Sequence, residues 1–164
     1  MKTKELILAL LILVLLFALV VSFDANADGC GYIEIHGIGR YELTFGQSVN
    51  QHQHIAQLSK QSGCQCVGNH YGSQSENGGQ WKLENLRLGD KAHLEYDTAN
   101  GTQIIHHSGD YTCYAVMIVD VVDGHLMRNG KEVLPYSKTD LICRTCVGHD
   151  STRNYVAFFE RIDK

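Results

Sequence analysis

The chain has 164 residues, of which 44% are apolar and 9% aromatic, with 16 glycines and a single proline. This composition excludes a disordered, collagen-like or proline-rich chain, and the length suits one folded domain rather than two. A net charge of −4 argues against a nucleic-acid partner, because phosphate contacts require a basic surface. Six cysteines and nine histidines are the unusual part of the composition.

The first feature along the chain is an apolar run over residues 6–23, preceded by two lysines. As a helix this run is about 27 Å long, close to the ~30 Å hydrocarbon thickness of a bilayer. We therefore predict a transmembrane signal anchor over residues 1–27, with the lysines in the cytoplasm and residues 28–164 forming an extracellular domain. The small-residue sequence at 25–27 leaves cleavage as a secretory signal peptide open as an alternative.

The rest of the chain is predicted to be mostly strand, because β-branched, aromatic and alternating residues recur between glycine-containing turns. The predicted strands cover residues 32–36, 92–97, 102–107, 112–122, 141–145 and 154–160. Asn100 and Gly101 predict a tight hairpin turn between two of these strands. Further reversals are predicted at positions 88–91, 123–124 and 129–130.

One α-helix is predicted over residues 49–62, where Ile55 and Leu58 share a face and Gly63 provides the stop. The polar, glycine-rich run 72–79 is predicted to be a mobile surface loop. Strands in this number, with one or two short helices, predict a mainly β domain. Such a domain closes into a barrel that leaves no exposed strand edge.

The six cysteines admit several structural roles. An even number of cysteines in an exported chain is typical of a framework of three disulfides. The pairs Cys64/Cys66 and Cys143/Cys146 are also candidate zinc ligands, although a C-x-C spacing is unusual for a structural zinc site. Cys143 and Cys146 by themselves form a C-x-x-C pair that can close into a disulfide.

Cys146 is also a candidate nucleophile. It ends a predicted strand and Arg153 opens the next one, so antiparallel pairing would bring the guanidinium close to the thiol. A neighbouring positive charge favours the thiolate and stabilises an oxyanion. His70 is the candidate proton partner, because it follows a short apolar run and enters a glycine-rich loop. Arg161 is the alternative guanidinium if the strand register differs.

The sequence around these residues resembles the sortase family. Residues 140–146 read DLICRTC and resemble the family's TLxTC strand, which ends in the nucleophilic cysteine. Residues 152–162 resemble the following strand, which the catalytic arginine opens. The sequence VGNH at 67–70 resembles the strand end that carries the family's histidine, and residues 81–91 resemble its F-x-x-L-x-x-L-x-x-G-D-x-I stretch.

The resemblance implies a sortase-like β-barrel of about eight strands and the activity of a cysteine transpeptidase. Cys146 would attack an LPxTG-like sorting-signal peptide to give a thioacyl-enzyme, and His70 would transfer the protons. Arg153 would hold the substrate carbonyl, with Thr145 in a supporting place at the oxyanion site. An amine acceptor, from a peptidoglycan precursor or a pilin lysine, would then resolve the intermediate. No metal or other cofactor is implied.

The sequence departs from the family pattern at the motif itself. Ile142 and Cys143 replace the first two residues of TLxTC, and Asn69 stands where many relatives have a glycine. Two other functions therefore stay open. One is an exported, disulfide-stapled binding module on the same barrel without catalysis, and the other is a zinc-stabilised domain.

Overall fold

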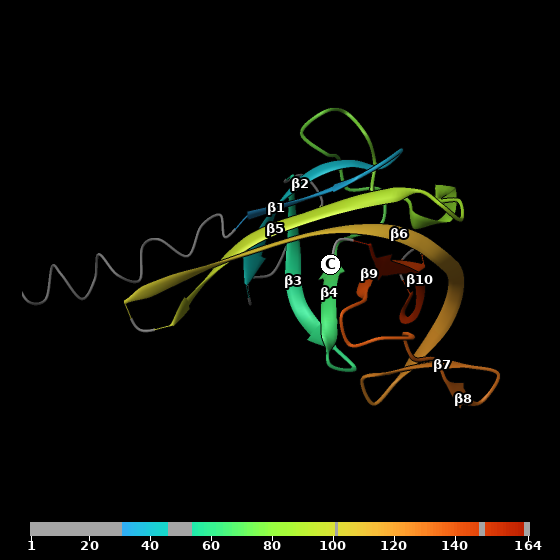
Figure 1. Cartoon of the computed structure of the whole chain (residues 1–164). Helices are drawn as coiled ribbons and strands as arrows, with labels where there is room; N and C mark the ends of the chain where they lie inside the picture. Colours follow the sequence, from blue (N-terminus) through green and yellow to red (C-terminus); the bar gives the residue numbers. More distant parts are fainter. Residues whose placement is uncertain (1–30, 46–53, 101, 148–149, 163–164) are drawn as a thin grey trace, which may run out of the picture.

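Figure 1 shows a computed structural model of the chain, which describes residues 31–45, 54–100, 102–147 and 150–162. These residues form ten strands and one short 3-10 helix, so the domain is mainly β as predicted. In chain order the elements are β1 (Gly31–Ile35), β2 (Gly39–Phe45), β3 (Ile55–Gln61), β4 (Cys64–Gly68), η1 (Leu83–Asn85), β5 (Lys91–Asn100), β6 (Gln103–Val122), β7 (His125–Arg128), β8 (Lys131–Glu132), β9 (Leu141–Val147) and β10 (Asp150–Arg161).

The predicted anchor over residues 1–27 lies outside the described residues. Within the described residues, no helix has both the length and the apolar character needed to cross a bilayer. The division at residue 27 therefore stays a prediction.

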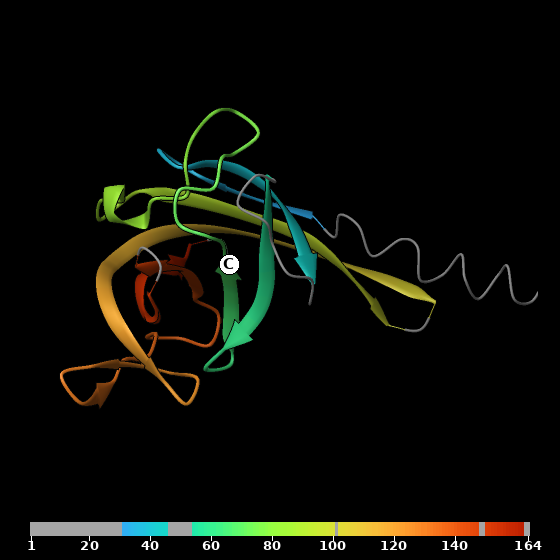
Figure 2. The ribbon, with the colours of Figure 1, turned by 180° about the vertical axis from the view of Figure 1, so that it is seen from behind.

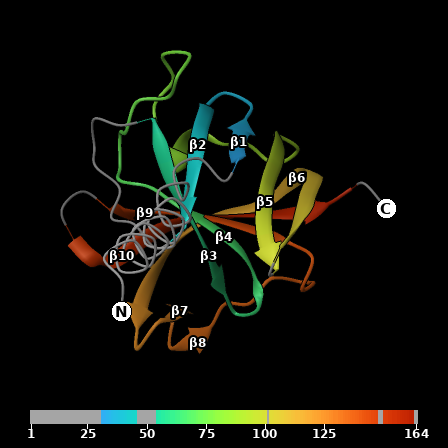
Figure 3. The same cartoon turned by 90° about the vertical axis from the view of Figure 1, so that its left-hand side faces the viewer.

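Eight of the strands close into a barrel (Figures 1 and 2). They follow the order β10-β9-β4-β3-β2-β1-β5-β6, and an antiparallel pairing of β6 with β10 completes the ring. The β2–β3 and β4–β9 pairs are parallel, and the other neighbours are antiparallel. Strands β7 and β8 extend the sheet beyond β6 (Figure 3), and the β5–β6 hairpin projects from the barrel wall (Figure 1). The predicted closed barrel of eight strands is confirmed.

All six segments predicted as strands lie in strands of the structure. Three of the predicted reversals are hairpin turns. The runs at 102–107 and 112–122 belong to one long strand, β6. β5 and β6 form the predicted hairpin, with Asn100 paired to Gln103, although Gly101 itself lies outside the described residues. The β6–β7 and β7–β8 turns each use an Asx-Gly pair with positive φ at both residues, which is the geometry of a type I′ turn.

The predicted helix at 49–62 is wrong in its described part, where the chain forms β3. Burial along β3 alternates, with Ala56 and Leu58 inside the barrel and their neighbours less buried. Gly63 does not end a helix, because with φ of 82° it belongs to the two-residue turn that joins β3 to β4. Residues 49–53 lie outside the described residues.

The core consists of two apolar clusters on opposite faces of the sheet. The larger cluster fills the barrel and includes Trp81, Tyr41, Phe159 and Cys143. The smaller cluster covers the other face of β4, β9 and β10, where side chains from β6 and β7 pack on it. Because side chains alternate along a strand, successive residues of β9 and β10 belong to different clusters. This alternation decides which side chains of β9 can meet.

Candidate active site

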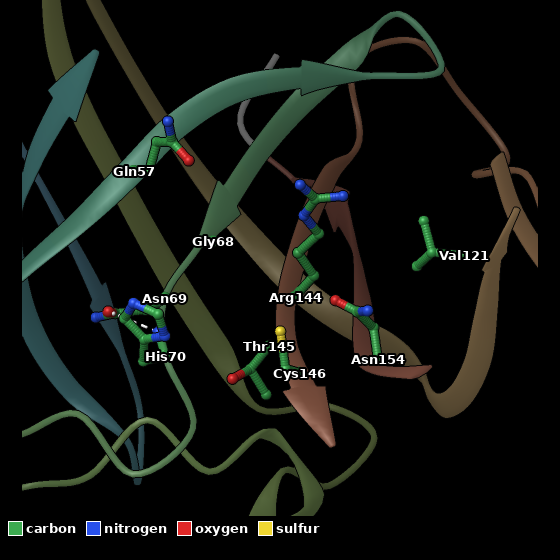
Figure 4. A pocket seen from close by; sticks show the side chains of 9 residues that line it. All are labelled: Gln57, Gly68, Asn69, His70, Val121, Arg144, Thr145, Cys146 and Asn154. Carbon is green, nitrogen blue, oxygen red and sulfur yellow. Dashed lines mark hydrogen bonds between the residues drawn. The ribbon is translucent and has the colours of Figure 1, made fainter. Parts of the chain in front are cut away.

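A pocket of about 300 Å³ lies at the end of the smaller cluster, where β9 finishes and β10 begins (Figure 4). Strands β3, β4, β6, β9 and β10 and the segment after β4 contribute to it. The lining residues are Gln57, Gly68, Asn69, His70, Val121, Arg144, Thr145, Cys146 and Asn154. Three of the four predicted site residues, His70, Thr145 and Cys146, therefore come together here.

Cys146 presents its thiol on the outer face of β9. The thiol is free and half-buried, and Cys146 pairs with Asn154 of β10, which also lines the pocket. Cys143 lies three residues earlier and points into the barrel, where it is fully buried. The two sulfur atoms are therefore on opposite faces of one strand, and the C-x-x-C pair does not close into a disulfide.

The other proposed cysteine roles find no support in the described part of the chain. Cys64, Cys66, Cys113, Cys143 and Cys146 are all free. Cys30 lies outside the described residues. The described residues contain no group of three or more histidine, cysteine or acidic side chains arranged to hold a metal ion.

His70 lies just beyond the end of β4 and is held there through the backbone of β9. The Asn69 N–H and the Trp81 indole N–H both donate to the Arg144 carbonyl, each at 3.2 Å. The side-chain oxygen of Asn69 accepts the backbone N–H of His70 at 2.9 Å. These bonds fix the start of the loop against the strand that carries Cys146. In Figure 4 the Thr145 side chain lies between His70 and Cys146.

The glycine-rich run at 72–79 is a loop, as predicted, and the residues beside it tie it to the barrel. Gly72 donates to the Trp81 carbonyl at 2.9 Å, and Trp81 donates to the Ser73 carbonyl at 2.8 Å. Ser73 and Ser75 are fully buried, unlike the residues of a surface loop. The loop therefore helps to hold His70 in place, because the Ser73 N–H donates to the His70 carbonyl at 3.2 Å.

Two buried polar groups of the pocket have no hydrogen-bond partner in the structure. They are the hydroxyl of Thr145 and the side-chain amide nitrogen of Asn69. Buried polar groups are almost always paired, and leaving one unpaired costs roughly 1–3 kcal/mol. Both groups line the same pocket as the thiol. A bound carbonyl or oxyanion would satisfy them.

The structure does not bring Arg153 into the pocket. Its guanidinium is 53% exposed and lies 3.8 Å from the carboxylate of Asp120 on β6. Because Asn154 faces the pocket, strand alternation turns Arg153 toward the other side of β10. Arg161 does not replace it, since it lies at the far end of β10 and donates to the Ser108 carbonyl at 2.7 Å. The arginine that lines the pocket is Arg144.

No protein-family model matches this chain, and no curated protein matches it in sequence. Its fold is nevertheless similar to solved sortases. Sortase A of Listeria monocytogenes matches with a TM-score of 0.54 at 13% identity, over 83% of this chain and 88% of that chain. Streptococcus pneumoniae sortase C gives 0.56 at 16% identity, over 84% and 70%. Clostridium perfringens sortase C with its C-terminal cell wall sorting motif gives 0.51 at 17% identity, over 84% and 72%.

These similarities show that the chain has a sortase-like fold. The closed barrel and the resemblance of the sequence motifs agree with this fold. Arg144 and Asn69 are two of the six pocket residues that were not predicted as site residues. Alternation along the predicted strand at 141–145 already places Arg144 on the same face as Cys146. Asn69 differs from the family pattern directly before His70, but nothing in the sequence predicts that its amide is buried without a partner.

Proposed function

We propose that this domain is a sortase-like cysteine transpeptidase that cleaves a peptide sorting signal and transfers the acyl group to an amine. One observation carries the proposal. The free, accessible thiol of Cys146 shares a pocket with an imidazole and with two buried hydrogen-bond donors that lack acceptors. This set contains a nucleophile, a proton carrier and donors for a developing oxyanion, which are the parts that acyl transfer requires.

The thiolate of Cys146 attacks the scissile carbonyl, forming a C–S bond and a tetrahedral oxyanion. His70 gives a proton to the leaving amine as the C–N bond breaks, so a thioacyl-enzyme remains. An incoming amine then gives its proton to His70 and attacks the thioester, which releases Cys146. The imidazole therefore acts first as an acid and then as a base.

Two polar groups among the residues that line the pocket are our candidate donors to the oxyanion. The hydroxyl of Thr145 and the amide of Asn69 are the groups that the structure offers, because both are buried and unsatisfied. The family resemblance assigns this work to Arg153 instead. In the structure Arg153 lies beside Asp120, so its participation would require the start of β10 to rearrange.

The substrate is an LPxTG-like sorting signal, and the acceptor is an amine from a peptidoglycan precursor or a pilin lysine. Support for a peptide substrate comes from the similar Clostridium perfringens sortase C, whose structure includes a C-terminal cell wall sorting motif. The domain at 28–164 would act outside the cell, tethered by residues 1–27. The domain and its surface-protein substrate would then lie on the same side of the bilayer.

The test is mass spectrometry of the full chain incubated with an LPxTG-type peptide. We expect an adduct with the mass of the acyl fragment on Cys146, which disappears when an amine such as triglycine is added. Cys146→Ala must form no adduct, and His70→Ala must form it far more slowly. An adduct that persists in Cys146→Ala, or wild-type protein that forms none with any sorting-signal peptide, would overturn the proposal.

A further inference from the structure

Arg144 is the one pocket residue whose charge the proposed reaction does not use. It lies two residues before Cys146 on the same face of β9 and is half-buried. Its guanidinium donates a long hydrogen bond of 3.4 Å to the side-chain oxygen of Gln61, a neutral group. Among the described residues no carboxylate pairs with it. A bound anion would supply the counter-ion that this partly buried cation lacks.

The guanidinium is displaced from the thiol along the strands. In Figure 4 the Arg144 side chain extends away from the sulfur atom of Cys146. Gln61 pairs with Cys64 at the far end of β4, whereas Arg144 itself pairs with Gly68. Burial raises the pKa of Cys66 to about 11, and the charge of Arg144 acts against that rise, which places the charge near Cys66. The group that Arg144 binds is therefore separate from the scissile carbonyl.

The pocket has room and charge for such a group. Its lining residues contain no aspartate or glutamate, and Arg144 is their only permanently charged side chain. A Cβ added at Gly68 would meet the Arg144 side chain at 3.7 Å, so the arginine runs alongside β4 at this glycine. A guanidinium fork binds a carboxylate through two parallel hydrogen bonds.

We propose that Arg144 makes this enzyme selective for sorting signals that carry an aspartate or glutamate close to the cleaved bond. Residues 144 and 146 are separated by about 7 Å along the strand, and the arginine side chain extends farther, so the carboxylate belongs roughly two to four residues from the scissile carbonyl. The inference rests on the proposed function, since it names the substrate class of the same pocket.

The test uses the full chain and paired peptides. A single glutamate is moved through the positions around the scissile bond of an LPxTG-type parent, and a matched set carries glutamine at the same positions. Wild-type protein should cleave the glutamate peptide at one position about tenfold faster in kcat/KM than its glutamine partner, the effect of one charge-assisted pair. Arg144→Gln should abolish that ratio, and Arg144→Glu should reverse it in favour of a lysine peptide.

The matched control is Arg128→Gln, which removes an exposed guanidinium on β7 that lines no part of the pocket. It should keep the wild-type ratio. Arg144→Lys retains the charge without the fork and should give an intermediate ratio. This variant keeps the test decisive if Arg144→Gln folds poorly. Equal rates for glutamate and glutamine at every position in wild type, or an unchanged ratio in Arg144→Gln, would overturn the proposal.

A binding measurement separates this inference from the reaction itself. Peptide affinity is measured by fluorescence anisotropy with the Cys146→Ala full chain, with and without Arg144→Gln. Glutamate selectivity in binding, together with no thioacyl formation by the wild-type chain, would uphold the arginine site and overturn the proposed catalysis. Thioacyl formation without glutamate selectivity would do the reverse, and the absence of both binding and thioacyl formation would overturn both.

Discussion

At the scale of single residues, burial divides the five described cysteines into one partly exposed thiol and four buried ones. Burial raises the pKa of Cys113 to about 11 and raises the pKa of Cys143 well above its ordinary value. It also raises the pKa of Cys64. A thiol with a raised pKa in an apolar cluster carries almost no thiolate near neutral pH and behaves as a small apolar side chain. Of the cysteines that the structure describes, Cys146 is the one that is both free and partly exposed.

Alkylation of the folded protein should therefore be selective. We expect iodoacetamide at pH 8 to modify Cys146, while Cys66, Cys113 and Cys143 react only after denaturation. Peptide mapping by mass spectrometry before and after adding guanidinium chloride measures this, and Cys146→Ala is the control. Modification of any buried cysteine at the rate of Cys146 in the native state would contradict the burial pattern.

Asn69 and Arg153 can be compared by mutation as groups that stabilise the oxyanion. Removing one oxyanion-hole donor typically costs about 100-fold to 1000-fold in kcat. We expect Asn69→Ala to lower kcat by a factor in this range, whereas Arg153→Ala should change it by less than about threefold, because an exposed ion pair contributes little. Stopped-flow rates of thioacyl formation are the measurement. The opposite ranking would show that the start of β10 rearranges to bring Arg153 to the substrate.

At the scale of elements, the sequence predicted β1, β5, β6, β9 and β10 and missed β2, β3, β4, β7 and β8. β5, β6 and β10 are the longest strands, and a long run of alternating residues is the clearest strand signal. β3 was mistaken for a helix because Ile55 and Leu58 are three residues apart, and Gly63 suits a helix stop and a hairpin turn equally well. This segment forms a strand because it pairs with β2 and β4, and the local sequence does not encode that pairing.

Local motifs predicted three of the residues that line the pocket. Cys146, Thr145 and His70 come from contiguous segments that end strands, and they meet in one pocket. Arg153 was misplaced because its position depends on the register of β10. An irregularity between Asp150 and Asn154 makes Asn154 the partner of Cys146 and turns Arg153 away. A one-residue change of register exchanges the two faces of a strand, so loop length alone does not determine which side chain faces the thiol.

The β5–β6 hairpin carries a row of histidines and carboxylates whose charge depends on pH. A 2.7 Å bond from His93 to the Asp110 carboxylate raises the pKa of His93, and a contact with Glu95 adds to this against the opposing effect of burial. Because the folded-state pKa lies above the ordinary value of 6.5, this interaction stabilises the fold fully below pH 6.5. The stabilisation is lost as the pH rises through the folded-state pKa.

Asp110→Asn should therefore destabilise the protein in acid and have little effect in base. At pH 5.5 we expect a loss below about 1 kcal/mol, as is typical of exposed pairs, and at pH 9 almost none. Urea unfolding at the two pH values measures the difference, with Glu160→Gln, at an exposed position on β10, as the control. A larger loss at pH 9 than at pH 5.5 would refute the assignment.

At the scale of the whole molecule, the barrel and the site depend on the same closing strand. β10 pairs with β6 to complete the ring and with β9 to place Asn154 opposite Cys146. Its side chains alternate between the two clusters, with Phe159 inside the barrel and Phe158 on the outer face. Loosening β10 would therefore open the barrel and disturb the pocket together, which ties the stability of the fold to the geometry of the pocket.

Phe159→Ala tests this coupling. Phe159 is fully buried beside Cys113, and truncating a buried phenylalanine costs about 3–5 kcal/mol. We expect guanidinium unfolding to show a loss of this size, together with faster alkylation of Cys113 and Cys143 in native buffer. Ile104→Ala, at a 76% exposed position on the β5–β6 hairpin, should change the free energy of unfolding by less than about 0.5 kcal/mol. If Phe159→Ala lost stability while both thiols stayed protected, β10 would open separately from the rest of the barrel, because a cooperative unit exposes all its buried thiols together.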